Sequence, residues 1–310
     1  MSNTAITLVL AGALALAIYN VLSRYFQRGD WEDRSALTTA LSMGGASLAL
    51  FIYSFATGGP QLSPDWLFPV SATGFLNIGI MFARTRARAL EEVSLVTPID
   101  STTPAVVILT AMIFIGEYPT NLGWLGIWVL VVGTYILNIQ DLIQQRKTGC
   151  GGSSWREKAV VYLAPFLILR KSAGVRWAFV AAGLSALSVP FDGLAARRAD
   201  VGFGFGIVFA IAALGNFVLV VALKEHRRFK CAEALWRMVA LGVPFAIGTI
   251  LVGLAFQISL VAYVGTMKRV MIPMTIILSY SILGEKKSFA SRIIGGIIMT
   301  VGAVIIALAE

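Results

Sequence analysis

Long apolar runs constrain this sequence more than any other feature. Ten of them are long enough to cross the roughly 30 Å hydrocarbon core of a bilayer as helices. Lipid offers the backbone no hydrogen-bond partner, so each run must pair its own N–H and C=O groups, as a helix does. The sequence therefore predicts an all-α polytopic membrane protein with ten transmembrane helices. The runs are 4–26, 35–57, 66–87, 92–115, 121–140, 174–196, 203–223, 236–256, 258–283 and 288–308.

The composition agrees with a membrane protein and excludes other classes. Hydrophobic residues make up 57% of the chain and charged residues 13%, whereas a soluble domain is about half apolar and a quarter charged. The formal net charge of +9 does not indicate a nucleic-acid partner, because the cations cluster in short connections between apolar runs, where they orient helices. The partners predicted are the lipid bilayer and a small-molecule substrate.

Residues that commonly carry chemistry are scarce. The two cysteines, Cys150 and Cys231, and the single histidine, His226, fall in basic loop segments, without the spacing of a metal site or a disulfide framework. A membrane-embedded enzyme would need a nucleophile with a base, or a metal cluster. The sequence shows neither arrangement, so we predict a protein that is not an enzyme, with no cofactor, no metal and no catalytic residues.

The basic residues are distributed asymmetrically along the chain. All but four of the 25 Lys and Arg residues lie in or beside the odd-numbered connections between runs. Arg197 and Arg198 lie in an even-numbered connection, and Lys268 and Arg269 lie within the ninth run. The positive-inside rule places the odd-numbered connections in the cytoplasm and both termini outside. We therefore expect a multi-pass protein of the cell (inner) membrane.

Four landmarks occur in the same order, at an almost constant spacing, in both halves of the chain. Each half has five predicted helices, so the second copy must enter the bilayer from the opposite side. The sequence thus predicts two inverted five-helix repeats over 1–140 and 174–310, joined by a linker over 141–173. Such repeats are typical of secondary transporters, whose site lies near the bilayer midplane. The landmarks are Pro104, Gly116-Glu117, Gly126 and Gly133 in the first half, and Pro273, Gly284-Glu285, Gly295 and Gly302 in the second.

Each landmark also has a structural interpretation. Glu117 and Glu285 follow a glycine that ends a helix, and their carboxylates then precede the next helix, where negative charge is favourable. The later glycines permit close contact between helices. Pro104 and Pro273 remove a backbone hydrogen bond and are expected to kink their helices at the site, where freed carbonyls face protein or a cavity.

This pattern resembles a known group of membrane proteins. Ten helices in two inverted halves, each closing with a Pro…Gly-Glu…Gly…Gly helix pair, are similar to the EamA type of the drug/metabolite transporter superfamily, above all over 90–140 and 258–308. The segment VGTMKRV (264–270) resembles the ninth-helix signature of the sugar-phosphate and phosphate translocators in that superfamily. In those relatives the Lys-Arg pair binds the substrate phosphate, so the resemblance implies this role for Lys268 and Arg269.

Lys268 and Arg269 also raise a physical question of their own. An isolated charge at the bilayer centre costs on the order of 3 kcal/mol. The pair can snorkel to an interface, pair internally with Asp100, or line an aqueous cavity and bind an anion. Helical spacing places Lys268 on a polar stripe of the ninth run, and Thr97 and Asp100 on a stripe of the fourth. We therefore expect Lys268 to line the central cavity and Arg269 to support it from the side.

Other residues within the runs complete the predicted substrate site. Asn20 and Asn77 interrupt apolar sequence and are expected either to contact the ligand or to form an interhelical hydrogen bond. Tyr263 is expected to wall the cavity, although aromatic residues in membrane helices more often pack. Asp192 follows Pro190 in the region that corresponds to Asn20 in the repeat. It is expected either to share the site or, because it lies near the end of the run, to face the membrane interface.

Together these features predict a secondary active transporter, either an exchanger or a carrier coupled to a proton or a counter-substrate. Its substrate is expected to be a small organic anion, phosphorylated or carboxylated, that moves by alternating access. The alternative is an exporter of amino acids or of drugs and other metabolites, in which Asp100 would hold an ammonium group and Lys268 a carboxylate. A membrane-embedded enzyme is a distant alternative.

Overall fold

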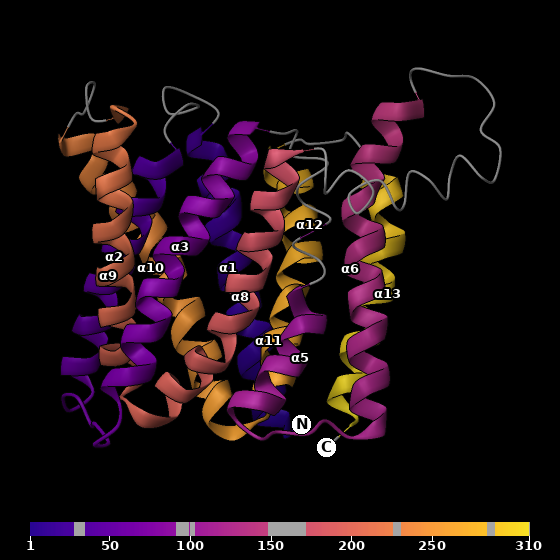
Figure 1. Cartoon of the computed structure of the whole chain (residues 1–310), viewed down its shortest axis with the longest axis horizontal. Coiled ribbons are helices and arrows are strands. Elements are labelled where there is room, and N and C mark those ends of the chain that lie inside the picture. Colours follow the sequence, from indigo (N-terminus) through magenta and orange to yellow (C-terminus); the bar gives the residue numbers. More distant parts are fainter. Residues whose placement is uncertain are drawn as a thin grey trace.

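The predicted all-helical fold is confirmed by the computed structural model, which describes residues 1–27, 35–90, 99, 103–147, 172–225, 231–283 and 289–309. Figure 1 shows the helices side by side in one bundle. They are α1 (Asn3–Gln27), α2 (Ser35–Ala56), α3 (Leu67–Leu90), α5 (Thr103–Phe114), α6 (Asn121–Lys147), α8 (Ala173–Arg198), α9 (Val201–Ala222), α10 (Cys231–Ile258), α11 (Val261–Met267), the short 3₁₀ helix η2 (Lys268–Val270), α12 (Met271–Leu283) and α13 (Phe289–Ala307). Within these residues, β-type pairing is limited to an isolated bridge between Leu62 and Ala199.

The described helices support several membrane crossings. Seven helical segments are long and apolar enough to span a bilayer. They include α1, α2, α3, α8, α9, α10 and the segment that runs from α11 to α12. α6 and α13 contain shorter apolar stretches, and α5 covers 12 residues of the run predicted over 92–115. Much of the rest of that run lies outside the described residues.

Two helices differ from the predicted runs. The run predicted over 258–283 is not one helix, because α10 continues to Ile258, the next helix begins at Val261, and η2 interrupts it. α6 continues to Lys147, into the predicted linker. An apolar run marks only the part of a helix that crosses lipid, and the same helix can continue into water.

Both chain termini lie at one end of the bundle, which we call the terminal end (Figure 1). The N-terminal ammonium donates a hydrogen bond to the carbonyl of Ala307 over 3.1 Å. The α2–α3 and α8–α9 connections also meet each other, since the N–H of Asp200 donates to the carbonyl of Gln61 over 2.8 Å. These hydrogen bonds tie the terminal end together.

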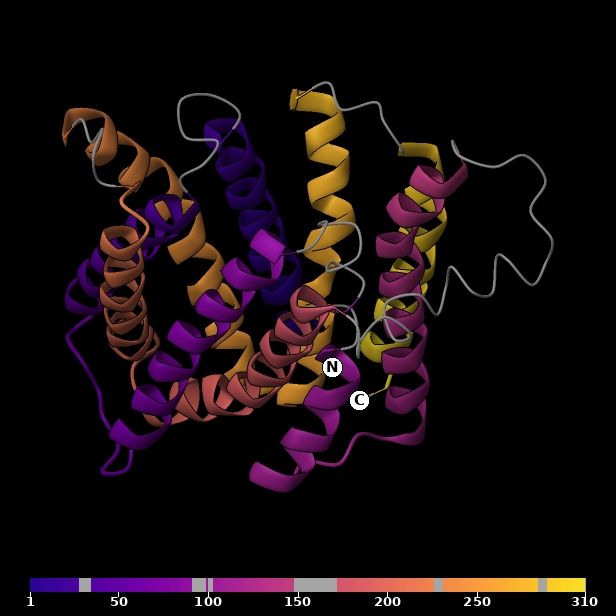
Figure 2. The ribbon, with the colours of Figure 1, turned by 45° about the horizontal axis from the view of Figure 1, so that its top comes forward.

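The largest helix contacts join the two halves of the chain. α2 packs on α9, α3 on α8, α1 on α10 and α6 on α13; the last pair is side by side in both Figures 1 and 2. A Cβ at Gly133 would lie 2.6 Å from the nitrogen of Met299, and one at Gly302 would lie 2.6 Å from the nitrogen of Leu130. Only glycine fits at such distances, so the prediction of glycine-mediated helix contact is confirmed.

The short helix α11 lies inside the bundle and leads to the basic pair. Val261, Tyr263, Val264 and Met267 are buried and belong to the main hydrophobic core. α9, by contrast, exposes large apolar side chains in its second half, as expected for a surface that meets lipid. These are Leu214, Phe217, Val218 and Val221.

Candidate functional site

Lys268 and Arg269 lie at a break in a membrane-crossing segment. α11 ends at Met267, the next three residues form η2, and α12 then begins. Pro273 has no N–H to donate to the carbonyl of Arg269, four residues earlier, and the backbone tightens to a 3₁₀ turn there. The kink expected at Pro273 itself stays a prediction. Both basic residues are half-buried, and Lys268 lies roughly 10 Å of helical rise from the start of α11.

Asp192 lies inside the bundle, on the side of α8 that contacts α3. The hydroxyl of Thr73 donates to the Asp192 carboxylate. The same hydroxyl oxygen lies 2.7 Å from that of Ser188, which therefore donates to Thr73. Of the two positions expected for Asp192, the structure therefore favours the one inside the bundle over the membrane interface. α8 continues to Arg198, so Asp192 lies well before the helix end, where its side chain turns to α3.

Asp192 and Lys268 lie near each other on either side of the contact between α8 and α11, which run in opposite directions. Val189 of α8 packs on Gly265 of α11, where a Cβ would lie 2.9 Å from the Val189 Cγ1. Asp192 and Lys268 each lie about one turn beyond this contact, on opposite sides of it. Helical side chains lean toward the N-terminus of their helix, which brings both side chains back toward the contact. Their charges interact electrostatically.

Arg84 on α3 adds a further positive charge. Its guanidinium donates a hydrogen bond of 3.3 Å to the hydroxyl of Ser185 on α8. Its charge and that of Arg269 both act on Lys268. We call Arg84, Lys268 and Arg269 the cationic cluster. The charge asymmetry of the sequence assigns Arg84 to the third connection, but α3 continues to Leu90 and Arg84 turns toward α8. Because like charges repel at close range, the cluster favours a bound anion.

The two predicted asparagines make hydrogen bonds within the protein. Asn20 on α1 donates to the hydroxyl of Thr275 on α12 over 3.4 Å, which is the interhelical hydrogen bond that was one of its two predicted roles. Asn77 donates to the backbone carbonyl of Thr73 over 2.8 Å. Asn77 therefore lies one turn from the residue that holds Asp192. Three other residues of interest, Thr97, Asp100 and Glu285, lie outside the described residues.

Tyr263 and Pro104 have structural surroundings. Tyr263 is completely buried, and its hydroxyl accepts a hydrogen bond of 3.0 Å from the backbone N–H of Thr120. This is the packing role that aromatic residues of membrane helices often have. Pro104 is the second residue of α5. In the first turn of a helix the missing N–H of proline costs no hydrogen bond.

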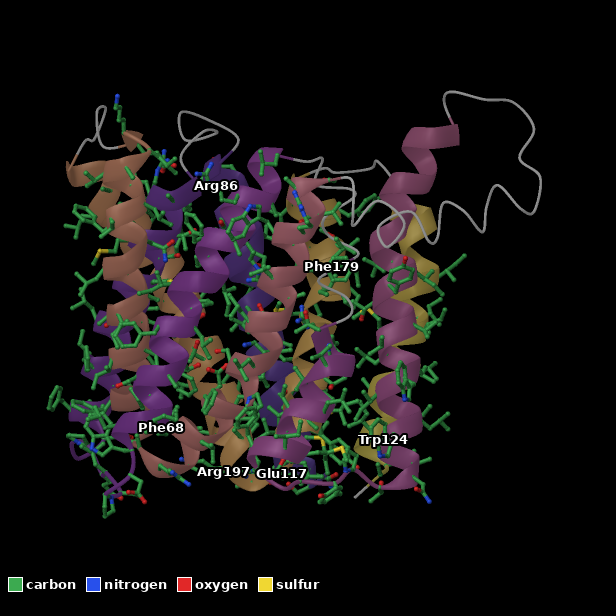
Figure 3. All side chains as sticks on the ribbon, in the orientation of Figure 1. Phe68, Arg86, Glu117, Trp124, Phe179 and Arg197 are labelled. Atoms are coloured by element: carbon green, nitrogen blue, oxygen red, sulfur yellow. The ribbon has the colours of Figure 1, made fainter. Side chains whose placement is uncertain are left out.

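Glu117 stabilises a helix, but not the next one in the sequence. Its Oε2 accepts from the N–H of Val261 over 2.7 Å, at the start of α11, and its Oε1 forms a 2.6 Å ion pair with Arg197. The start of α6 is capped instead by Thr120, whose hydroxyl accepts from the N–H of Gly123 over 3.1 Å. Figure 3 shows Glu117 and Arg197 together at the terminal end. The prediction that Glu117 stabilises the start of the next helix along the chain is therefore wrong.

The first half of the chain matches a family of membrane proteins. Residues 3–139 match the EamA-like transporter family. Together with the apolar helices, this match identifies a multi-pass integral membrane protein. It ends well before Lys268, so the resemblance of 264–270 to the sugar-phosphate translocators stays a prediction.

A solved structure described as "Crystal structure of protein" has a similar fold. It superposes with a TM-score of 0.72 at 18% sequence identity, over 100% of this chain and 98% of that chain. The likeness therefore extends over the second half, which the family match does not reach. A comparison with curated proteins gives no significant match.

Four residues of the candidate site are absent from the sequence prediction. A sequence signal exists for two of them, because Ser185 and Ser188 recur with Asp192 at intervals of three and four residues along one face of an apolar helix. A hollow of about 300 Å³ near the start of α8 is lined by other residues, and none of the four site residues named next lines it. The four residues are Thr73, Arg84, Ser185 and Ser188.

Proposed function

We propose that this protein is a secondary transporter that moves a small organic anion across the membrane by alternating access. The match of 3–139 to a transporter family supports transport, and the cationic cluster supports an anionic substrate. The observation that carries the proposal is the position of Lys268 and Arg269 in a 3₁₀ break inside a membrane-crossing segment. Ionisable residues at such depth are costly, and they mark ligand sites and transport pathways.

Two inverted five-helix repeats would provide the architecture that alternating access needs. The helix contacts support this repeat. When each helix of the first half is replaced by the helix at the same place in the second half, and the reverse, each of these contacts becomes another contact that is also present. The contact of α3 with α8 corresponds to that of α10 with α1, and α5 with α8 corresponds to α12 with α1. The α2–α9 and α6–α13 contacts each join two helices that are matched to each other, so the replacement leaves these contacts unchanged.

The distribution of basic residues supports an orientation in the cell (inner) membrane. The odd-numbered connections would lie in the cytoplasm and the terminal end outside. Arg197 is an exception to the charge bias, and its ion pair with Glu117 supplies a structural reason for that exception. A reporter fused at Glu310 should score as external, and a cytoplasmic score would overturn this orientation.

The chemistry of the cationic cluster favours phosphate or carboxylate groups. Arginine presents a planar fork of N–H donors, and lysine presents a compact charge. Arg84 on α3 and Lys268 on η2 offer both kinds of donor from different elements, so oxygens of one anion can accept from both. The anion would also reduce the repulsion within the cluster. Exchange for a second anion and coupling to a proton are both compatible with this chemistry.

A second candidate function is transport of a zwitterion such as an amino acid. The observation that favours it is the Asp192 carboxylate next to the cationic cluster, held by the hydroxyl of Thr73. Lys268 would bind the carboxylate of the substrate, and Asp192, in place of the predicted Asp100, would bind its ammonium group.

Thermal stabilisation of the purified protein separates the two candidates. Inorganic phosphate, phosphorylated sugars, dicarboxylates and amino acids are tested singly, and each compound that raises the Tm is tested for uptake into proteoliposomes. We expect phosphates or carboxylates to raise the Tm and to be transported, and Lys268→Ala to remove both effects. Arg176→Ala, which removes an exposed cation of α8, is the matched control. Effects of amino acids alone would support the second candidate, and no transport of any compound would overturn both.

A further inference from the structure

An acidic residue next to an anion site needs an explanation, because its charge opposes binding of the substrate. Asp192 is such a residue. We propose that Asp192 is the internal counter-ion of Lys268 in the empty carrier, and that it allows the unloaded protein to change its conformation. This inference rests on the proposed function and assigns a role that anion binding itself does not require.

The position of Asp192 is held by two helices. The Thr73 hydroxyl from α3 donates to its carboxylate, and Ser188, one turn earlier on α8, donates to Thr73. Thr73 and Ser188 are both buried, so neither hydroxyl can exchange this partner for bulk water. The carboxylate is therefore fixed on the side of α8 that contacts α3, and from there its charge acts on Lys268.

The charges around Lys268 make a counter-ion necessary. Arg84 on α3 and Arg269 on η2 add positive charge, and Asp192 is the acidic residue among the described ones whose charge acts on Lys268. Removal of Asp192 would leave Lys268 without this compensation, next to the two further positive charges that act on it. A buried charge without a partner is unfavourable, most of all when water is excluded from the site.

Alternating access requires such a water-excluded state twice in each cycle. When substrate is bound, its own negative charge compensates the cationic cluster during the change of conformation. When the site is empty, Asp192 supplies the compensation, so the empty carrier can return. Net transport depends on this return step, whereas exchange of one anion for another does not, because the carrier is then loaded in both directions.

Asp192→Asn should therefore separate exchange from net transport. Uptake of radiolabelled inorganic phosphate is measured in proteoliposomes with the membrane potential collapsed, once into phosphate-free vesicles and once into vesicles preloaded with phosphate. We expect net uptake to fall about tenfold or more, because the empty site keeps an uncompensated charge. Exchange should fall far less than net uptake, because the carrier is then loaded in both directions. Binding of phosphate should tighten severalfold, because a competing negative charge is removed.

Two further variants keep the proposal testable where Asp192→Asn does not fold. Asp192→Glu keeps the charge and should retain most net uptake. Thr73→Val removes the hydroxyl that orients Asp192 and should lower net uptake more than exchange. Asp65→Asn, which removes an exposed acid at the terminal end, is the control for loss of one negative charge.

The outcomes distinguish this inference from the proposed function. An equal loss of exchange and net uptake in Asp192→Asn and Thr73→Val, or no change in either, would overturn the counter-ion role while leaving anion transport in place. Absence of phosphate exchange by the unmodified protein, with no other anion transported, would overturn the proposed function itself.

Discussion

The guanidinium of Arg197 and the carboxylate of Glu117 form an ion pair of 2.6 Å that joins three connections at the terminal end. Arg197 also donates to the carbonyls of Phe256 and Ser259, over 2.8 Å and 2.9 Å. Glu117 accepts from the N–H of Val261 as well. The pair thus links the end of α8, the end of α10, the start of α11 and the segment before α6.

Substitution of either member of this ion pair should lower stability. Glu117→Gln keeps an oxygen for the Val261 N–H but removes the charge, and Arg197→Lys removes the fork that reaches two carbonyls and the carboxylate. The side chains are 11% and 30% exposed, so we expect a loss of about 1–3 kcal/mol for each. Thermal unfolding in detergent measures it, with Arg198→Lys as control. A Tm unchanged in both variants would show that the pair is unimportant for folding.

Two glycine substitutions should have opposite effects on stability, one at the α6–α13 contact and one on an open face of α8. Gly302→Val would place side-chain atoms where a Cβ alone already lies 2.6 Å from the nitrogen of Leu130, so the two helices must separate. We expect little folded protein. A Cβ at Gly183, within α8, meets no atom within 4 Å, so Gly183→Ala should stabilise the helix by about 0.5–1 kcal/mol. Yield and Tm of the purified variants test both expectations, and equal behaviour of the two variants would contradict the packing.

Thr110 compensates for the proline inside α8. Pro190 cannot donate to the carbonyl of Ala186, four residues earlier. The hydroxyl of Thr110 on α5 donates to that carbonyl over 2.9 Å and shares its proton with the carbonyl of Val107, at 3.0 Å. Thr110→Val should cost about 1 kcal/mol, a typical net value for one hydrogen bond. The cost should shrink in a Pro190→Ala background, because an alanine at this position restores the missing N–H. A double-mutant cycle of unfolding measures this, and additive effects would refute the link.

Lys268 and Asp192 should be coupled in the empty protein. Lys268→Ala removes the cation whose charge acts on the Asp192 carboxylate, and because both residues are only half-buried we expect a cost of about 1–3 kcal/mol. Addition of Asp192→Asn should restore part of the lost stability, with a coupling of about 1 kcal/mol or more. The measurement is unfolding of the four proteins without ligand. If the double variant is only as stable as the sum of single effects predicts, the two charges do not interact in the folded protein.

The helices and the glycine faces that pack closely could be predicted from the sequence, because lipid leaves so few alternatives. Apolar segments that cross a bilayer must satisfy their backbone internally, so the runs and the helices agree closely, as in α1 and α2. Glycines at a spacing of seven residues fall on one helix face, so close packing at these faces of α6 and α13 could be inferred without coordinates, whereas their packing on each other could not. The unusual position of Lys268 and Arg269 within an apolar run is likewise a property of the sequence alone.

What only the tertiary structure decided is which polar groups meet. The rotation and relative height of α3, α8 and α11 bring Arg84, Asp192 and Lys268 to one place, and no local pattern encodes those two quantities. Glu117 shows the same limit. Sequence reasoning assigns its carboxylate to the next helix along the chain, whereas the fold places the start of α11 beside it. Electrostatic and hydrogen-bond partners are chosen by distance in space, and in a helical membrane protein that distance is set by packing of apolar surfaces between residues far apart in the sequence.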